Sequence, residues 1–136
     1  MESIVVDSYA WVEYSEGSKE GENAKKYIDE GDYNLYTPSI VVGELSDRAT
    51  REGMRTDWEE KLLPFIRRQS VVVSVDGAIA ERAGRVKWEM REESPQAGLA
   101  DAIVLSVARE YDAKVLTGDP NFLVDTLSDE VIDVTS

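Results

Sequence analysis

Four acidic residues occupy positions from which they could act together: Asp7, Glu44, Asp101 and Asp119. Asp7 directly follows a short apolar run, and Asp119 lies two residues beyond another. Glu44 and Asp101 fall within the first turn or two of apolar helical segments. The chain has no His and no Cys, so it offers a metal or a substrate neither imidazole nor thiolate. The main route left to chemistry is a hard cation held by carboxylate oxygens.

Short β-branched runs alternate with longer helical patterns along the chain. The runs predict strands over residues 3–6, 34–37, 71–75, 114–117 and 130–133, and the patterns between them predict helices over 8–12, 22–30, 39–52, 57–68, 78–92 and 99–111. This alternation predicts an α/β fold, a three-layer α/β/α sandwich around a central, mostly parallel sheet of four to five strands. No linker or repeat interrupts the 136 residues, so we expect a single domain over residues 1–136.

The predicted sheet decides where the acids meet. In open parallel sheets the active crevice lies outside the carboxyl ends of the strands. Asp7 and Asp119 each follow a strand and belong on that edge. Glu44 and Asp101 reach the same crevice if their helices start there.

Each acid also has a purely structural explanation. Asp7 could cap a helix, and Asp119 followed by Pro120 could cap another. Asp101 could complement a helix dipole, although its apolar neighbours make an unpaired charge there costly. Glu44 follows an apolar run and precedes a leucine, which is an unfavourable place for a solvated face.

Taken together, the four acids predict a cation site. Carboxylates brought within about 4–5 Å would repel by about 1 kcal/mol per pair in water, and by about 4 kcal/mol at an effective dielectric of 20. Such costs are large against a domain stability of roughly 5–15 kcal/mol, so the cluster must take up protons or a cation. Oxygen ligands alone favour Mg²⁺ or Mn²⁺ over zinc or copper. Because Mg²⁺ is often completed by phosphate oxygens, a substrate containing phosphate is expected.

The net charge of −13 permits two interpretations. The acidic surface could bind a basic partner, or it could keep the protein soluble in a salty cytoplasm. On charge alone nucleic-acid binding is disfavoured, because a basic patch is its usual footprint. That objection weakens in high salt, since the Debye length is only about 3 Å at 1 M. We expect no signal peptide and no membrane span, and therefore a cytoplasmic location.

Four segments together resemble a known family: residues 4–8, 41–45, 99–103 and 116–122. In order and spacing they are similar to the PIN-domain nucleases, in particular to the VapC-type toxins of toxin–antitoxin pairs. The resemblance implies an α/β/α sandwich and cleavage of RNA that depends on Mg²⁺ or Mn²⁺. It maps the four acids onto the acidic quartet of the family, and Thr117 onto a hydroxyl residue just before the last acid. Many relatives carry a further acid where this chain has Asn121, which puts a second metal site in question.

The implied reaction is hydrolysis of a phosphodiester by a metal-bound water. Asp7, Asp101 and Asp119 would be ligands, directly or through water, and Glu44 would ligate or orient the attacking water. Thr117 would fix Asp119 or the water network. By resemblance the product carries a 5′-phosphate, the protein forms a homodimer, and a small antitoxin protein inhibits it with a basic side chain near the acids. The absence of histidine excludes a mechanism in which histidines exchange protons with the ribose.

Substrate contacts remain open between alternatives. Arg48, Arg51 and Arg55 share a helical stripe with Glu44 and could guide phosphates, or they could form intrahelical ion pairs, as with Glu52. Asn121 is a further candidate for substrate contact. Four aromatic residues could stack on bases or pack in the core or an interface: Trp11, Tyr14, Trp58 and Trp88.

Two other functions compete with the nuclease. A catalytically silent PIN module would keep the fold and bind RNA or a protein partner. A receiver-type phosphotransfer domain also gathers acids at strand ends. It normally has adjacent acids after its first strand, whereas Asp7 is followed by Ser8 and Tyr9.

Overall fold

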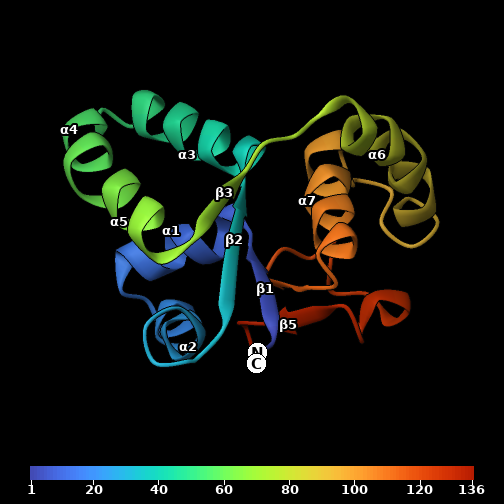
Figure 1. Cartoon of the computed structure of the whole chain (residues 1–136), viewed down its shortest axis with the longest axis horizontal. Helices are drawn as coiled ribbons and strands as arrows, with labels where there is room; N and C mark the ends of the chain where they lie inside the picture. The colour runs from blue at the N-terminus through green and yellow to red at the C-terminus, as the bar shows by residue number, and fades with distance from the viewer.

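A five-stranded sheet forms the centre of the molecule (Figure 1). The computed structural model describes all residues from 1 to 136. The strands are β1 (Ser3–Val6), β2 (Asn34–Pro38), β3 (Val71–Val73), β4 (Lys114–Thr117) and β5 (Val131–Asp133). They lie in the order β3-β2-β1-β4-β5, and every neighbouring pair is parallel. The predicted α/β fold is thus confirmed, with a wholly parallel sheet.

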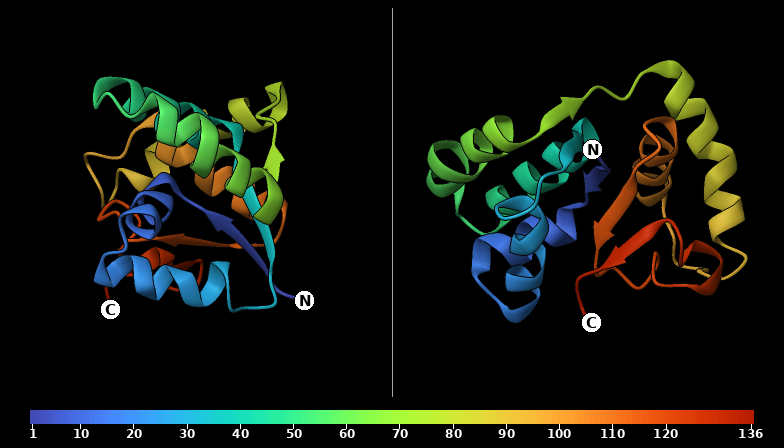
Figure 2. Two further views of the ribbon diagram at one scale, coloured as in Figure 1. Left: turned by 90° about the vertical axis from the view of Figure 1, so that its left-hand side faces the viewer. Right: turned by 60° about the horizontal axis from the view of Figure 1, so that its bottom comes forward.

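Helices cover both faces of this sheet (Figures 1 and 2). One layer contains α1 (Ser8–Glu16), α2 (Lys19–Ile28), α3 (Ser39–Arg51), α4 (Arg55–Asp57) and α5 (Leu63–Gln69). The other contains α6 (Gly77–Met90) and α7 (Leu99–Glu110), and a short 3-10 turn at Asp125–Leu127 leads to β5. The arrangement is the predicted α/β/α sandwich. No helix is long and apolar enough to cross a membrane.

The strand order places a switch point between β1 and β4. From β1 the chain crosses to β2 and then β3 on one side, whereas β4 and β5 lie on the other side. Crevices for ligands form at such switch points, outside the carboxyl ends of the strands. The register pairs Val6 with Leu116, and the Asp7 backbone N–H donates to the Leu116 carbonyl at 3.2 Å. The first residue after β1 therefore lies beside the last residue of β4.

Apolar burial fixes β1, β4 and α7 in place. Residues 4–6 and 115–116 are at most 1% exposed, as expected for strands covered on both faces. Residues 102–108 of α7 are all buried, so this helix lies in the centre of the fold. The Trp11 indole N–H donates to Thr37 Oγ1 at 3.2 Å, so the largest core side chain leaves no unpaired donor. The edge that carries the acids is thus a rigid platform.

Gly118 marks a close approach beside that edge. A Cβ atom at this position would lie 2.4 Å from the Tyr9 ring and 2.8 Å from the Thr135 methyl group. Only glycine lets the segment after β4 pass so closely to α1. This packing keeps the segment that carries Asp119 beside the start of α1, which follows Asp7.

One predicted helix is interrupted. The helix expected over 57–68 is instead α4, then a π-helical segment at Trp58–Leu62, then α5. The Leu63 N–H donates to the Trp58 carbonyl five residues earlier. Pro64 supplies the reason: it has no N–H to donate, so a regular α-helical ladder cannot run through this position.

Candidate active site

Asp7 stands at the centre of the predicted edge. It occupies the residue before α1, but its side chain makes no capping hydrogen bond, so the capping explanation for this carboxylate is wrong. The Thr117 hydroxyl donates instead to Asp7 Oδ2 at 2.7 Å. Asp7 is 4% exposed, one of few buried polar residues in the chain. Thr117 therefore holds the Asp7 carboxylate at the edge of the sheet, and the carboxylate does not cap α1.

Thr117 links Asp7 to the last acid. Its hydroxyl oxygen also accepts a hydrogen bond from the Asp119 backbone N–H at 3.0 Å. The hydroxyl thus orients the carboxylate of Asp7 and only the backbone of Asp119, a division that spacing alone did not predict. No helix begins after Asp119; its Oδ1 accepts from the Asn121 N–H at 2.9 Å within a turn. The helix-cap explanation for Asp119 is therefore wrong.

Asp101 is the third residue of α7 and half-buried. Its Oδ2 accepts from the Gly98 backbone N–H at 3.0 Å, so it does help to start the helix. The same oxygen accepts from the Asn121 side-chain amide at 3.2 Å. Asn121 therefore links Asp101, at the start of α7, to Asp119, which follows the carboxyl end of β4.

Glu44 lies on α3 and is exposed to solvent. Its flanking apolar residues had suggested that it avoids a solvated face, and that prediction is wrong. Val41 and Leu45 turn into the core, which leaves Gly43 and Glu44 on the outer side of the helix. The Ser8 side chain of α1 lies beside the Glu44 carboxylate and opposes the rise of its pKa.

The four carboxylates act on one another electrostatically. Burial first, then repulsion from Glu44 and Asp119, raises the pKa of Asp7 to about 7, against the opposing hydrogen bond from Thr117. The pKa of Glu44 is raised by partial desolvation and by Asp101 and Asp119. The pKa of Asp101 is raised by burial and by Asp119, while Gly98 and Asn121 oppose the rise. Side chains from four separate segments thus share one electrostatic environment.

The carboxylates supply the right kind of donor for a divalent cation but do not form a ready-made cluster. No three acidic side chains lie close enough to hold a metal ion among them as they stand. Hydrogen bonds engage one oxygen each of Asp101 and Asp119, and Asp7 accepts from the Thr117 hydroxyl and the Ser8 backbone N–H. Oxygen ligands are those that Mg²⁺ takes in proteins, where it commonly keeps several waters and only one or two carboxylates.

The sequence of residues 4–124 matches the PIN domain family, a span that contains all four acids. The chain is a PIN-domain protein. The resemblance drawn from its four segments is therefore confirmed. A search of curated proteins found no match.

Solved structures share the fold of this PIN domain. A DNA-bound VapBC from Salmonella typhimurium superposes with a TM-score of 0.74 at 15% identity, covering 98% of this chain and 99% of that one. A toxin–antitoxin complex from Klebsiella pneumoniae gives 0.69 at 18% identity, covering 97% and 98%. VapC20 from Mycobacterium tuberculosis, described as a toxin that cleaves the sarcin–ricin loop, gives 0.67 at 19% identity, covering 85% and 87%.

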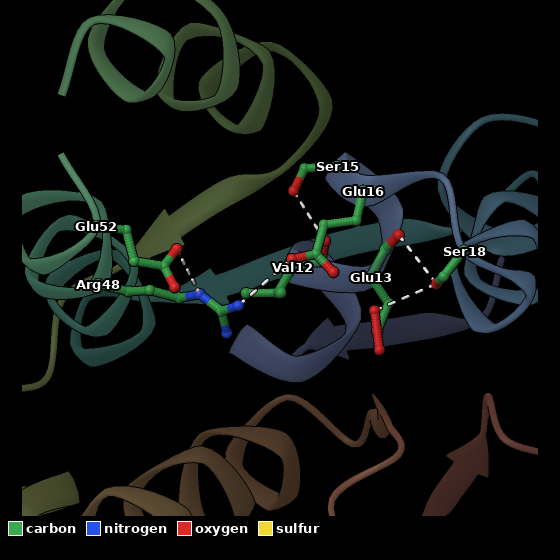
Figure 3. Close-up of polar contacts among 7 residues, drawn as sticks. All are labelled: Val12, Glu13, Ser15, Glu16, Ser18, Arg48 and Glu52. Atoms are coloured by element: carbon green, nitrogen blue, oxygen red, sulfur yellow. Dashed lines mark hydrogen bonds and ion pairs between the residues drawn. The ribbon is translucent and has the colours of Figure 1, made fainter. Parts of the chain in front are cut away.

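The arginine stripe of the PIN domain is engaged by carboxylates. Arg48 contacts Glu52 at 3.3 Å and Glu16 of α1 at 3.4 Å (Figure 3). Arg51 pairs with Asp47 at 3.2 Å, and Arg55 pairs with Glu59 at 2.7 Å. The three arginines therefore form ion pairs, as the second interpretation predicted. A phosphate would have to displace their carboxylate partners.

A groove lies away from the acids. A groove of about 710 Å³ runs between α1, α3 and the segment from Met54 to α5, and none of the four acids lines it. Leu45, Trp58 and Phe65 contribute apolar surface, and Arg48 and Glu52 stand among its charged residues. Its mixed lining is typical of a site for an amphipathic protein segment, not of a polyanion site.

The aromatic residues divide by burial. Trp11 and Trp58 are 0% and 4% exposed, so packing is their role. The Tyr14 ring stacks on Phe65, with centroids 5.4 Å apart. Trp88 of α6 is 64% exposed, and Lys87 and Arg91 lie over its ring at 5.4 and 5.2 Å. Among the four, only Trp88 presents a largely free aromatic face.

Proposed function

We propose that this PIN domain is a metal-dependent endoribonuclease, and that it is the toxin of a toxin–antitoxin pair. One observation carries the proposal: carboxylates from four separate segments share one electrostatic environment at the switch point of the sheet, where burial and neighbouring acids raise the pKa values of Asp7, Glu44 and Asp101. One structural neighbour is described as a toxin–antitoxin complex and another as a toxin, which supports the proposal that this chain is a toxin. One domain over residues 1–136, a homodimer and a cytoplasmic location remain predictions.

Each residue of the site has its own proposed role. Asp7, Asp101 and Asp119 would hold Mg²⁺ or Mn²⁺, directly or through water. The ion supplies Lewis-acid chemistry: it makes bound water acidic and stabilises negative charge on a phosphate. Thr117 keeps one Asp7 oxygen engaged, so that the other faces the crevice. Glu44, on the exposed side of α3 beside Ser8, would ligate the ion or accept a proton from the attacking water. The water oxygen would bond to phosphorus as the bond to the 3′-oxygen breaks, and the 3′-oxygen would take a proton from solvent water, which gives a 3′-hydroxyl and a 5′-phosphate.

The direct test is digestion of a folded RNA by the purified chain. We expect internal cleavage with Mn²⁺ or Mg²⁺, products with 5′-phosphate ends, and no cleavage in excess EDTA. Adding metal back should restore activity. Full activity in the chelator would refute the mechanism. Binding of RNA without any cleavage under every metal condition would instead support the silent PIN module.

We further propose that a small antitoxin protein binds the groove between α1, α3 and α5. Met54 lies on its rim and is 48% exposed, so its apolar side chain is available to a partner. The mixed charges around the apolar floor suit a helix with one apolar face. Arg48, tied to Glu16 and Glu52, would set the position of the charged rim.

A substitution on this rim tests the partner. Because Met54 is exposed, Met54→Asp should leave the thermal midpoint within about 2 °C of the original, as surface changes usually do. It should weaken the complex with the protein encoded beside this chain by about tenfold or more, measured by calorimetry. Met54→Leu is the matched control and should bind normally. Equal affinity for Met54→Asp and the original chain would place the partner elsewhere.

A further inference from the structure

Asn121 lies at the meeting point of three hydrogen bonds. Its backbone N–H donates to Asp119 Oδ1 at 2.9 Å, and its side-chain amide donates to Asp101 Oδ2 at 3.2 Å. Its carbonyl accepts from the Ser94 hydroxyl at 3.0 Å. One residue thus connects two carboxylates of the site and a third segment of the chain.

Ser94 is an anchor for this arrangement. It is 5% exposed, although it lies in the loop between α6 and α7, where polar residues usually face water. The same loop is tied down by Arg91, whose Nε donates to the Ala97 carbonyl at 2.7 Å. The hydroxyl that holds Asn121 therefore comes from a segment that is itself fixed.

The chemistry of the amide decides its role. The Nδ2 group of asparagine only donates hydrogen bonds, and here it donates to a carboxylate, so through this group Asn121 acts on a ligand oxygen of Asp101. By occupying Asp101 Oδ2 and Asp119 Oδ1, Asn121 leaves Asp101 Oδ1 and Asp119 Oδ2 as the free pair. It also brings no charge of its own to a site already crowded with carboxylates.

We infer that Asn121, anchored by Ser94, is a positioning residue: its side-chain amide orients Asp101 for the cation, and its backbone N–H holds Asp119. This rests on the proposed function and deepens it. The partners that orient a ligand typically change metal affinity or activity by about 10- to 100-fold when they are removed.

The test measures Mn²⁺ binding by calorimetry without RNA, and kcat and KM with RNA. Asn121→Ala should weaken Mn²⁺ binding by about 10- to 100-fold and lower kcat, with KM for RNA nearly unchanged. Ser94→Ala should move both quantities in the same direction by a smaller factor. In the Asp101→Asn background, Asn121→Ala should cost little further, because its target carboxylate is already gone.

Matched controls separate positioning from folding. Asn23→Ala removes an amide that donates to the Val134 carbonyl at 2.7 Å, and Ser106→Ala removes a buried hydroxyl that donates within α7. Both should lower the thermal midpoint and leave Mn²⁺ affinity unchanged. If Asn121→Ala also changes only the thermal midpoint, or is fully additive with Asp101→Asn, the inference is overturned while the nuclease stands. An original chain that binds no Mn²⁺ and cleaves no RNA overturns both.

Discussion

Asp7→Asn should abolish RNA cleavage and at the same time make the protein more stable. The loss should exceed the roughly hundredfold that substitution of an outer residue costs, because this carboxylate is proposed to hold the cation itself. Asparagine keeps an oxygen that can accept the Thr117 hydrogen bond, now 2.7 Å long, so the local structure should persist. The change therefore separates function from folding more cleanly than a truncation.

The gain in stability follows from the pKa of Asp7. Its folded value of about 7 lies above the ordinary value of 3.8, so the folded state binds the proton more tightly than the unfolded state. The stability gained from this proton is complete below about pH 4 and is lost as the pH rises through 7. At pH 8 the charged, buried group costs about 4 kcal/mol, which asparagine would avoid.

Thermal unfolding measures this difference. At pH 8 without metal, the midpoint of Asp7→Asn should lie on the order of 10 °C above that of the original chain, and the gap should shrink towards pH 4. Asp32→Asn, at an exposed position, should alter neither stability nor cleavage. An Asp7→Asn protein that is less stable than the original at pH 8 would show that the carboxylate is stabilised in the fold.

Divalent cations should stabilise the original chain far more at pH 8 than at pH 5. At the lower pH the proton on Asp7 competes with the cation, whereas above pH 7 the charged carboxylates repel one another unless a cation is present. Mn²⁺ at about 100 times its Kd adds roughly 2.7 kcal/mol, which is several degrees in the midpoint for a chain of this size.

The pH dependence distinguishes this effect from general binding to an acidic surface. Scans with Mn²⁺ and with EDTA at both pH values should give a large difference only at pH 8. In Asp7→Asn that difference should be small at either pH. A shift of equal size at pH 5 and pH 8 in the original chain would argue that the cation does not interact with Asp7.

Sequence reasoning reached the fold because its signals were local. The runs 3–6 and 114–117 are short and β-branched, and a strand buried on both faces needs little else to be recognised. The parallel arrangement then fixed the edge on which Asp7 and Asp119 lie. The break at Trp58–Leu62 was missed because Pro64 was given no weight within an otherwise helical pattern.

The details of the site could not be predicted, because they depend on contacts distant in sequence. Thr117 donates to Asp7, 110 residues away, and the strand register sets that pair. Ser94 contacts Asn121 across a loop that carries no periodic signal. The exposure of Glu44 depends on which side of α3 packs inward, and its apolar neighbours gave a misleading indication.

The unequal burial of the three tryptophans gives the protein its own optical reporter. Trp11 and Trp58 lie in the core, whereas Trp88 stands on the outside of α6. Neutral acrylamide in the solvent should therefore quench mainly the long-wavelength part of the emission, which comes from Trp88. The blue-shifted emission that remains comes from Trp11 and Trp58 and reports on the interior. One emission spectrum therefore distinguishes changes on the surface of α6 from unfolding.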